Sequence, residues 1–459
     1  MAADISPRRP GADLLDLDTL TLRDRLATGA LRAGEVAEAV ISRVAEHEPE
    51  VQAFAWFDAG TLRAEADRLD RLRRTGLPVG PLHGIPVGVK DIIDTRGIPT
   101  CNGTAIDAGR VPSEDAFVVR RLRAAGALIA AKTVTAEMAY LHPGPTRNPA
   151  DPSRTPGGSS QGSAAAVSAG MLPLCVGTQT GGSVIRPASF CGVMGFKPSF
   201  GLIPRTGILT QSPSLDCVGV FAGSIEAAAL LAEVLMGDDP SDPATTPRAP
   251  LRLLDITSSV PPVRPTLAIL HLSPGGLAPE PDMAAALAEV EAALGDAAFA
   301  LTLPSLFDEA LPARECINLA EMAKCYHPHE RRGAALMSET LAGAMERGRA
   351  IPARDYLAAL DWPRVLNAAL DTIFDRCDAI VTPAAPGAAP GSETTGSSAF
   401  NGLWSLCGVP TVTLPLLTSS DGMPMGLQVV GRRGDDASLL RTARWIWTTL
   451  ASSQGESHA

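Results

Sequence analysis

Residues 85–94 read IPVGVKDIID, a short β-branched run that contains one proline and one glycine. Such a run is typical of a buried strand, and it places Lys90 at or near the strand's end. A helix is predicted over 117–125, closed by Gly126, and a second strand follows over 127–132. This alternation of strand and helix predicts an α/β fold with helices on the faces of a sheet.

Outward from this segment, the chain is expected to form a single domain over 1–459 with four regions. Apolar residues recur at three- and four-residue spacing through much of 14–74, which predicts helices there. The core is expected over 80–221, and a variable helical region that covers a site is expected over 224–370. The region 376–450 returns to the core. Its expected elements are strands over 379–383, 411–415 and 426–431 and a helix over 436–450.

Composition and charge exclude two classes of partner. The chain has 459 residues, 45% hydrophobic and 19% charged, which is typical of a globular protein with a large core. Its net charge is -11 and it has no strong basic run, so nucleic acid is not an expected partner. Two uncharged stretches, 155–185 and 394–420, are broken by Gly, Ser and Pro. They predict buried backbone near a site, not a membrane span.

The cysteine pattern and the N-terminus bear on the compartment. The eight cysteines are scattered and none forms a CxxC pair, so buried, reduced thiols are expected. Residues 1–18 have no apolar core of the signal-peptide type. We therefore expect a reducing, cytoplasmic environment.

Lysine is rare in this chain. Of the 39 basic side chains, four are lysines: Lys90, Lys132, Lys197 and Lys324. Because lysine can lose its proton when desolvated, whereas arginine stays charged, a retained lysine is a candidate for a role that arginine cannot fill.

The most unusual local sequences are TPGGSSQGS at 155–163 and GTQTGGS at 177–183. Glycines directly before a serine allow positive φ and expose backbone N–H groups. Successive exposed N–H groups can bind an anion, as an oxyanion hole beside a nucleophile requires. The two segments are therefore candidate parts of a catalytic site.

Three chemistries compete for these segments. Phosphate binding is disfavoured, because neither GxxxxGK[ST] nor GxGxxG is present here. Residues 158–162 match the nucleophile-elbow pattern GxSxG, centred on Ser160, but a Pro-rich polar loop precedes them where the elbow needs a hydrophobic strand. The third chemistry pairs serine with a lysine base. The histidines that an elbow could use stand in no distinctive setting: His271, His327, His329 and His458.

Lys90 is the candidate base. A free lysine has a pKa of about 10.4, so neutrality near pH 7 needs a drop of about 3 units, or about 4 kcal/mol. Burial among the surrounding Ile and Val side chains can supply this drop. Asp91 and Asp94 would oppose it if either approached the ammonium. A structural ion pair therefore stays open as the alternative.

At these residues the sequence resembles the amidase signature family. The resemblance rests on GxPxxxKD at 84–91, GGSS at 157–160, and a GGS that ends at Ser183, 24 residues after Ser159. It continues through 187–199, 214–216 and 422–428. It implies a mixed, twisted β-sheet sandwiched by α-helices, and an enzyme that cleaves carboxylic amides without a metal or an organic cofactor.

The resemblance also assigns roles by position. Ser183 resembles the nucleophile that forms the acyl-enzyme, and Lys90 resembles the base. Ser159 resembles a serine that relays the proton between them and has a cis peptide bond on its N-terminal side. Four successive backbone amides resemble the oxyanion hole of the family: those of Thr180, Gly181, Gly182 and Ser183.

The substrate is indicated by one arginine. Arg186 lies three residues after Ser183, as in the malonamidase-type variant, in which the corresponding arginine binds a substrate carboxylate. The alternative is a buried arginine that holds backbone carbonyls or an acid. The segment 395–401 resembles the same subgroup and is expected to line the pocket. Together these features predict a small amide that carries a carboxylate.

Other functional classes stay open. In subunits of tRNA-dependent amidotransferases, an arginine usually stands two residues after the nucleophile, and here that position is Ile185. An inactive binding protein is disfavoured, because Lys90, Ser159 and Ser183 are all present. The run HPHE at 327–330 is interpreted as a set of polar residues on the surface and not as a metal site. By resemblance, homodimerisation through the N-terminal helices is also an expectation, with a small-molecule amide as substrate.

Overall fold

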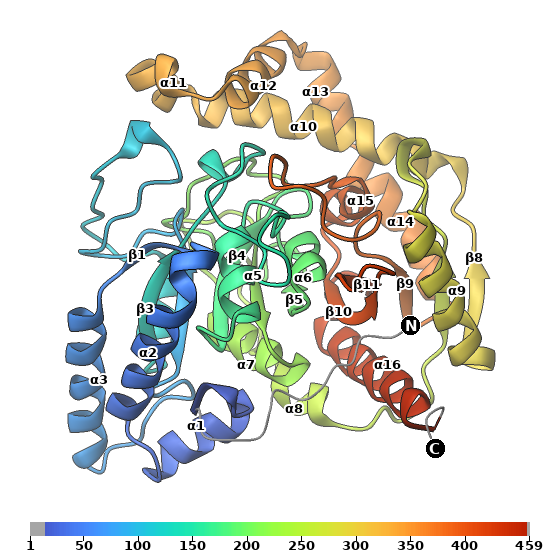
Figure 1. The fold of residues 1–459 in the computed structure, drawn as a ribbon. Coiled ribbons are helices and arrows are strands. Elements are labelled where there is room, and N and C mark those ends of the chain that lie inside the picture. Colours follow the sequence, from blue (N-terminus) through green and yellow to red (C-terminus); the bar gives the residue numbers. More distant parts are fainter. Residues whose placement is uncertain (1–13, 457–459) are drawn as a thin grey trace.

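The computed structural model describes residues 14–456, with side chains placed through residue 451. Its eleven strands form one sheet in the order β1-β3-β2-β4-β6-β5-β10-β11-β9-β7-β8 (Figure 1). The strands are β1 (Phe54–Phe57), β2 (Pro86–Lys90), β3 (Leu128–Thr133), β4 (Leu174–Gln179), β5 (Met194–Lys197), β6 (Cys217–Ala222), β7 (Leu267–Leu270), β8 (Ala298–Leu301), β9 (Ala379–Pro383), β10 (Thr411–Thr418) and β11 (Pro424–Val430).

Helices surround this sheet. In chain order they are α1 (Thr19–Thr28), α2 (Ala33–Val51), α3 (Ala59–Arg74), α4 (Phe117–Ala124), α5 (Gln161–Ser168), α6 (Ile185–Cys191), α7 (Ile225–Leu235), α8 (Leu253–Ser258), α9 (Pro281–Leu294), α10 (Ala310–Cys325), α11 (His327–Gly333), α12 (Glu339–Ala350), α13 (Ala353–Ala359), α14 (Trp362–Phe374), α15 (Ala399–Cys407) and α16 (Asp436–Glu456).

The sheet is mixed, as predicted. β3, β2 and β4 are parallel neighbours, and so are β9, β7 and β8, whereas the strands between these two groups pair antiparallel. α5 and α6 pack together against β4 and β10, and a second group is formed by α7, α8 and α16, which pack against one another (Figure 1). The expected α/β fold, with a sheet between layers of helices, is confirmed.

Two of the predicted regions contain strands that the sequence pattern did not indicate. β1 lies inside the helical region 14–74 and pairs antiparallel with β3 at one edge of the sheet. β7 and β8 lie inside the region 224–370, at the other edge. These strands are four residues long, and β8 reads AFAL, which consists largely of good helix formers. Tertiary pairing overrides local preference in such short segments.

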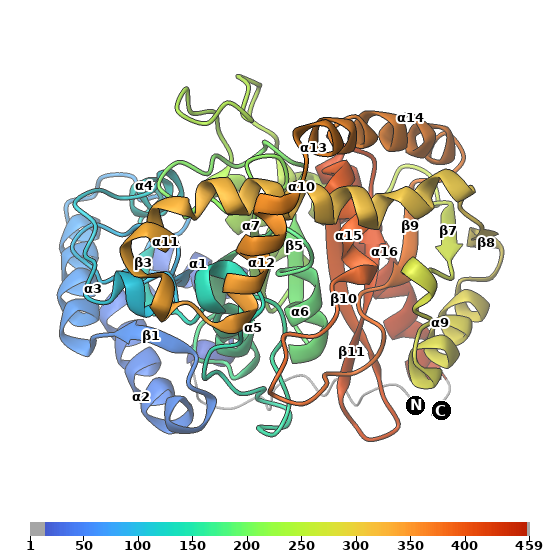
Figure 2. The ribbon, with the colours of Figure 1, turned by 90° about the horizontal axis from the view of Figure 1, so that it is seen from above.

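The helices α10–α13, here called the helical cap (residues 310–359), cover the edge of the sheet where β2 and β4 end (Figures 1 and 2). Glu321 of α10 holds the loop before β6, accepting hydrogen bonds from Ser212 Oγ at 2.5 Å and from Ser214 N at 3.0 Å. The Tyr326 hydroxyl donates to Met138 O at 2.5 Å. The cap is therefore tied directly to the loops around that edge.

All eight cysteines are unpaired. Within residues 14–456, none of the helices combines the length and the apolar character that a membrane crossing needs.

Candidate active site

Two parallel strands bring the lysine base candidate to the serine loop. Lys90 is the last residue of β2, and β2 pairs with β4 in a register that sets Val89 opposite Val176. Parallel strands end at the same edge of a sheet, so Lys90 reaches the loops that follow β4. Its Nζ lies 2.7 Å from Ser159 Oγ and 2.9 Å from Thr178 Oγ1.

The surroundings of Lys90 favour the neutral amine. Its side chain is fully buried, and this burial lowers the pKa of Lys90 to about 7, although the Asp216 carboxylate acts in the opposite direction. Both hydrogen-bond partners of Nζ are hydroxyl groups, which can donate to a neutral amine or accept from an ammonium. Lys90 can therefore gain and lose a proton near neutral pH.

The two nearby aspartates do not pair with Lys90. Asp91 lies 3.6 Å from the ammonium of Lys132 on the neighbouring strand β3. Asp94 forms an ion pair with Arg110 at 2.7 Å. The structural ion pair that the sequence left open for Lys90 is therefore not formed.

Ser159 and Ser183 meet where the two glycine-rich loops touch. The backbone N–H of Ser159 donates to Ser183 Oγ at 3.1 Å. Within residues 14–456, this is the hydrogen bond that joins the two serines, and their hydroxyls do not bond to each other directly. A proton relay through both hydroxyls therefore needs a rearrangement that brings Ser183 Oγ into a hydrogen bond with Ser159 Oγ.

The prediction of a cis peptide bond before Ser159 is wrong. The part of the chain that the structure describes has no cis peptide bond, so the Gly158–Ser159 peptide is trans. A trans peptide avoids the cost of about 3 kcal/mol that a cis bond carries before a residue other than proline. The turn is made instead by Gly157 and Gly158, whose φ values are 87° and 59°.

The loop that carries Ser183 presents free backbone donors. Among the described residues, no acceptor is found for the backbone N–H groups of Gly181, Gly182 and Ser183. Ser405 Oγ donates to Gly181 O at 2.8 Å, which fixes the peptide plane. Gln179 Oε1 accepts from the next two N–H groups, those of Val184 and Ile185. The loop is thus held in place while its central donors stay available for an anion.

Thr180 and Asp216 form the outer wall of this site. The Thr180 hydroxyl donates to Asp216 Oδ1 at 2.6 Å, and Asp216 Oδ2 accepts from Gln211 N and Ser212 N at 2.9 Å each. Burial raises the pKa of Asp216 to about 6. A cavity of about 480 Å³ is lined in part by Thr178, Thr180 and Asp216, and so extends to a residue that is hydrogen-bonded to Lys90.

Arg186 lies in α6, beside the Ser183 loop, with only 1% of its surface exposed. Its Nε and Nη1 have no hydrogen-bond partner, and within residues 14–456 it forms no ion pair. The structure therefore contradicts the alternative in which Arg186 holds backbone carbonyls or an acid. The segment 395–401 borders the same loops, since Thr395 O accepts from Gly158 N at 2.9 Å.

The structure does not support Ser160 as the nucleophile of an elbow. Ser160 Oγ donates to Thr178 O at 3.0 Å and accepts from Thr178 N at 3.2 Å, so this hydroxyl joins α5 to β4. The histidines pair elsewhere, and His458 lies outside the described residues. The pairs are His271 with Glu291, His327 with Glu330, and His329 with Asp107.

Three residues of the site were not assigned by the sequence. Thr178 shares a face of β4 with Val176, the partner of Val89, so strand alternation alone does not place it beside Lys90. The contact forms where β2 and β4 both end. Asp216 lies in one of the segments that carry the family resemblance, but the resemblance assigns it no role. Arg314 lies in the helical cap, more than 100 residues from Ser183, and no local pattern indicates that it reaches the loop.

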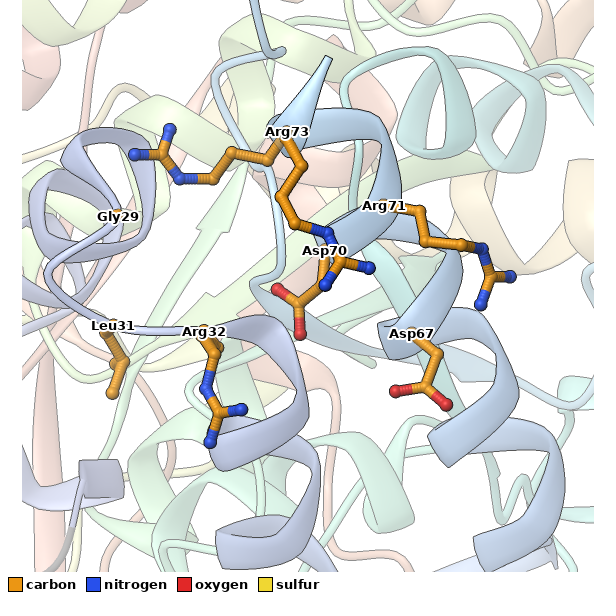
Figure 3. Close-up of a pocket in the computed structure, with 8 residues that line it drawn as sticks. Gly29, Leu31, Arg32, Asp67, Asp70, Arg71 and Arg73 are labelled. Carbon is orange, nitrogen blue, oxygen red and sulfur yellow. The ribbon is translucent and has the colours of Figure 1, made fainter. Parts of the chain in front are cut away.

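A second hollow of about 500 Å³ lies on the surface between the α1–α2 turn and α3 (Figure 3). Arg73 extends across Gly29, and Asp70 accepts from the N–H groups of Ala33 and Gly34 at the start of α2. Its lining contains no serine, cysteine or histidine: Gly29, Leu31, Arg32, Asp67, Asp70, Arg71, Arg73 and Arg74. It has no nucleophile, and the chemistry belongs to the Lys90 site.

The arrangement around Lys90 combines the groups that acyl transfer needs. A lysine with a pKa near 7 lies in contact with a serine hydroxyl, and a second serine stands beside it next to free N–H donors. Such a set can deprotonate a nucleophile and stabilise an oxyanion.

The chain is similar to known amidases and amidotransferase subunits along most of its length. The family model described as Amidase matches residues 35–440. A glutamyl-tRNA(Gln) amidotransferase subunit from Chloroflexus aggregans is 34% identical over 457 residues, covering 91% of this chain and 93% of that protein. A crystal structure of an amidase has a TM-score of 0.81 and 31% identity, covering 94% of this chain and 99% of the other. A 6-aminohexanoate cyclic dimer hydrolase has a TM-score of 0.84 and 27% identity, covering 96% and 98%.

Proposed function

The chain belongs to the amidase family of enzymes that act on carbon–nitrogen amide bonds, and we propose that it is an amidohydrolase working through a serine acyl-enzyme. In this proposal Ser183 is the nucleophile, Ser159 the proton relay and Lys90 the base. The observation that carries it is the buried hydrogen bond of 2.7 Å between Lys90 Nζ and Ser159 Oγ.

The proposed reaction uses one relay in both directions. Neutral Lys90 takes a proton from Ser159 Oγ, which takes one from Ser183 Oγ once the two hydroxyls are hydrogen-bonded. Ser183 Oγ attacks the amide carbon, and the N–H groups of Gly181 and Gly182 stabilise the oxyanion, with Thr180 at the edge of the loop. The relay then returns the proton to the leaving nitrogen, and the carbon–nitrogen bond breaks.

Hydrolysis of the acyl-enzyme completes the cycle. A water molecule gives its proton to the same relay and attacks the acyl carbon, and Ser183 Oγ leaves with the returned proton. The products are a carboxylic acid and ammonia or an amine. Every proton in this scheme moves between the substrate, water, the two serines and Lys90.

The direct test is activity profiling of the chain on primary amides, anilides and carboxylate-bearing amides, with Ser183→Ala as the blank. A fluorophosphonate probe is expected to label Ser183 in the wild type and to leave the variant unlabelled. Hydrolysis by Ser183→Ala at the wild-type rate, or labelling of another serine, would refute the assignment.

We further propose that the preferred amides carry a carboxylate, because Arg186 is buried beside the nucleophile without a partner. Arg186→Ala is expected to lower kcat/KM for malonamate, the half-amide of malonic acid, far more than for propanamide. An equal loss for both amides would show that Arg186 supports the loop and does not read the substrate.

A second candidate is a glutaminase component that supplies ammonia to a partner complex. It is favoured by the glutamyl-tRNA(Gln) amidotransferase subunits among the relatives, which are 31% to 35% identical. Against it, Ile185 stands where the amidotransferase pattern usually has arginine. Glutaminase activity of the purified chain, measured with and without amidotransferase partner subunits, separates the two: stimulation by the partners would favour the second candidate.

A further inference from the structure

We propose that Arg314, on α10 of the helical cap, is the second guanidinium of a carboxylate site that it forms with Arg186, and that it determines specificity for short amides bearing a carboxylate. This inference rests on the proposed function, because it concerns which amide the Ser183 site accepts. It assigns a residue of the cap to the site that the glycine-rich loops of the core form around Ser183.

The geometry places both guanidiniums on one loop. A Cβ atom added to Gly181 would lie 3.0 Å from Arg314 Nη1, and one added to Gly182 would lie 3.1 Å from Arg186 Nη1. The two arginines thus end against successive glycines, directly before Ser183. An anion held between them lies beside the loop whose free N–H groups face the reacting carbonyl.

Neither guanidinium of the pair has a carboxylate in direct contact among the described residues. Arg186 Nε and Nη1 and Arg314 Nε are buried without a hydrogen-bond partner, and neither side chain forms an ion pair among the described residues. Burial, with the repulsion from Arg314, lowers the pKa of Arg186 to about 9. Two desolvated cations that repel each other are costly, and a shared anion offsets that cost.

The acidic residue next to Arg314 in the sequence is paired with another arginine. Glu315 forms an ion pair with Arg347 of α12 at 3.4 Å. Arg314 lies instead over Gly402 of α15, where an added Cβ would come within 3.2 Å of its Nε. The absence of a side chain at Gly402 and Gly181 leaves the space in which this guanidinium extends toward the loop.

The chemistry favours a carboxylate on the substrate's own acyl chain. Guanidinium groups bind carboxylates through paired N–H donors, and two of them can hold both oxygens. Because both arginines lie against the loop that carries the nucleophile, the spacer between carboxylate and amide must be short. Malonamate fits this description, and propanamide is its neutral counterpart.

The test compares kcat/KM for malonamate and propanamide in the wild type, Arg186→Met, Arg314→Met and the control Arg331→Met, a change at an exposed cap arginine. Arg314→Met is expected to lower kcat/KM for malonamate by about 10-fold or more, mainly through KM, and to leave propanamide within about 2-fold. Arg331→Met should leave both values unchanged. Equal losses for the two amides in Arg314→Met, or no loss, would overturn the inference.

Binding provides a readout that does not require turnover. Malonate titrated calorimetrically into Ser183→Ala is expected to bind, and Ser183→Ala/Arg314→Met is expected to bind it about 10-fold more weakly. Unchanged malonate affinity in the double variant would refute the role of Arg314. If malonate binding depends on Arg314 while Ser183 neither hydrolyses amides nor reacts with the fluorophosphonate, the carboxylate site stands and the proposed function fails.

Discussion

Lys90 and Ser159 are 69 residues apart in the chain, yet their Nζ and Oγ atoms lie 2.7 Å from each other with both side chains buried. No carboxylate takes part in this contact, because Asp91 is paired with Lys132. The amine is therefore free to change its protonation state.

The pH profile should report the protonation of Lys90. Because the neutral amine is the active form and its pKa is about 7, kcat/KM is expected to rise with pH through about 7 and to level off above it. The Asp216 carboxylate raises the pKa of Lys90, so Asp216→Asn should move the rising limb of the pH profile to lower pH by about one unit or less. A limb that stays in place, or moves to higher pH, would contradict the assignment of Lys90 as the base.

Lys90→Met should abolish activity and stabilise the fold. The folded pKa of Lys90 lies well below its ordinary value of 10.5, so between about pH 7 and 10 the unfolded state holds more protons. The wild type therefore gains stability as the pH rises through that interval. At lower pH the folded state is destabilised, because it must hold the buried amine in its charged form. Met removes the ionisable group, and we expect the free energy of unfolding to increase by about 1 to 3 kcal/mol at pH 7.

The measurements for Lys90→Met are thermal or denaturant unfolding at pH 6, 7 and 9, alongside amide hydrolysis. The increase in the free energy of unfolding over the wild type should be largest at pH 6 and smallest at pH 9. Lys90→Arg serves as the matched control, because it keeps a positive charge that cannot be given up. It should be inactive and less stable than the wild type. An active Lys90→Arg would rule out general-base catalysis at this position.

Ser159→Ala and Ser160→Ala should differ sharply in catalytic activity. Ser159 Oγ contacts the lysine, so its loss is expected to lower kcat by about 100-fold or more. Ser160 Oγ bonds only the backbone of Thr178, so its loss should cost about 1 kcal/mol of stability and leave most of the activity. Steady-state kinetics and unfolding curves of the two variants check this, and the reverse result would favour a nucleophile at Ser160.

Gly158→Ala should damage catalysis through the backbone. Gly158 has φ 59°, and a Cβ there would lie 3.0 Å from Ser183 Cα and 2.8 Å from Pro187 Cδ. We expect a loss of about 1 to 2 kcal/mol of stability and a much larger fall in kcat than in substrate binding. Gly422→Ala, also at positive φ but with open space around it, controls for strain alone. Equal kinetics in the two variants would contradict this account.

Much of the core was predictable because its local signals agree with its tertiary role. The run 85–94 is β-branched and buried, and it does form β2 with Lys90 as its last residue. The helix predicted over 117–125 and the strand over 127–132 are α4 and β3, each within a residue or two of its predicted bounds. Periodicity succeeds where burial on the sheet selects the same residues that the local backbone prefers.

The remaining parts depend on contacts that a local pattern does not contain. β1 and β8 pair at the two edges of the sheet, and each has only four residues, which is too short a segment for a periodic pattern to predict a strand. The trans peptide before Ser159 and the approach of Arg314 to Gly181 are set by packing between distant segments. The contact between Lys90 and Ser159 was anticipated only as an implication of resemblance, since spacing alone left an ion pair open.

The order of the strands has a consequence for how the protein matures during synthesis. β10 and β11 are among the last elements made, yet they sit in the middle of the sheet, between β5 and β9. A nascent chain that stops short of residue 411 leaves β5 and β9 without the hairpin that joins them. Ribosome-bound intermediates should therefore present two unjoined half-sheets, and catalytic competence should appear only when the hairpin closes the gap.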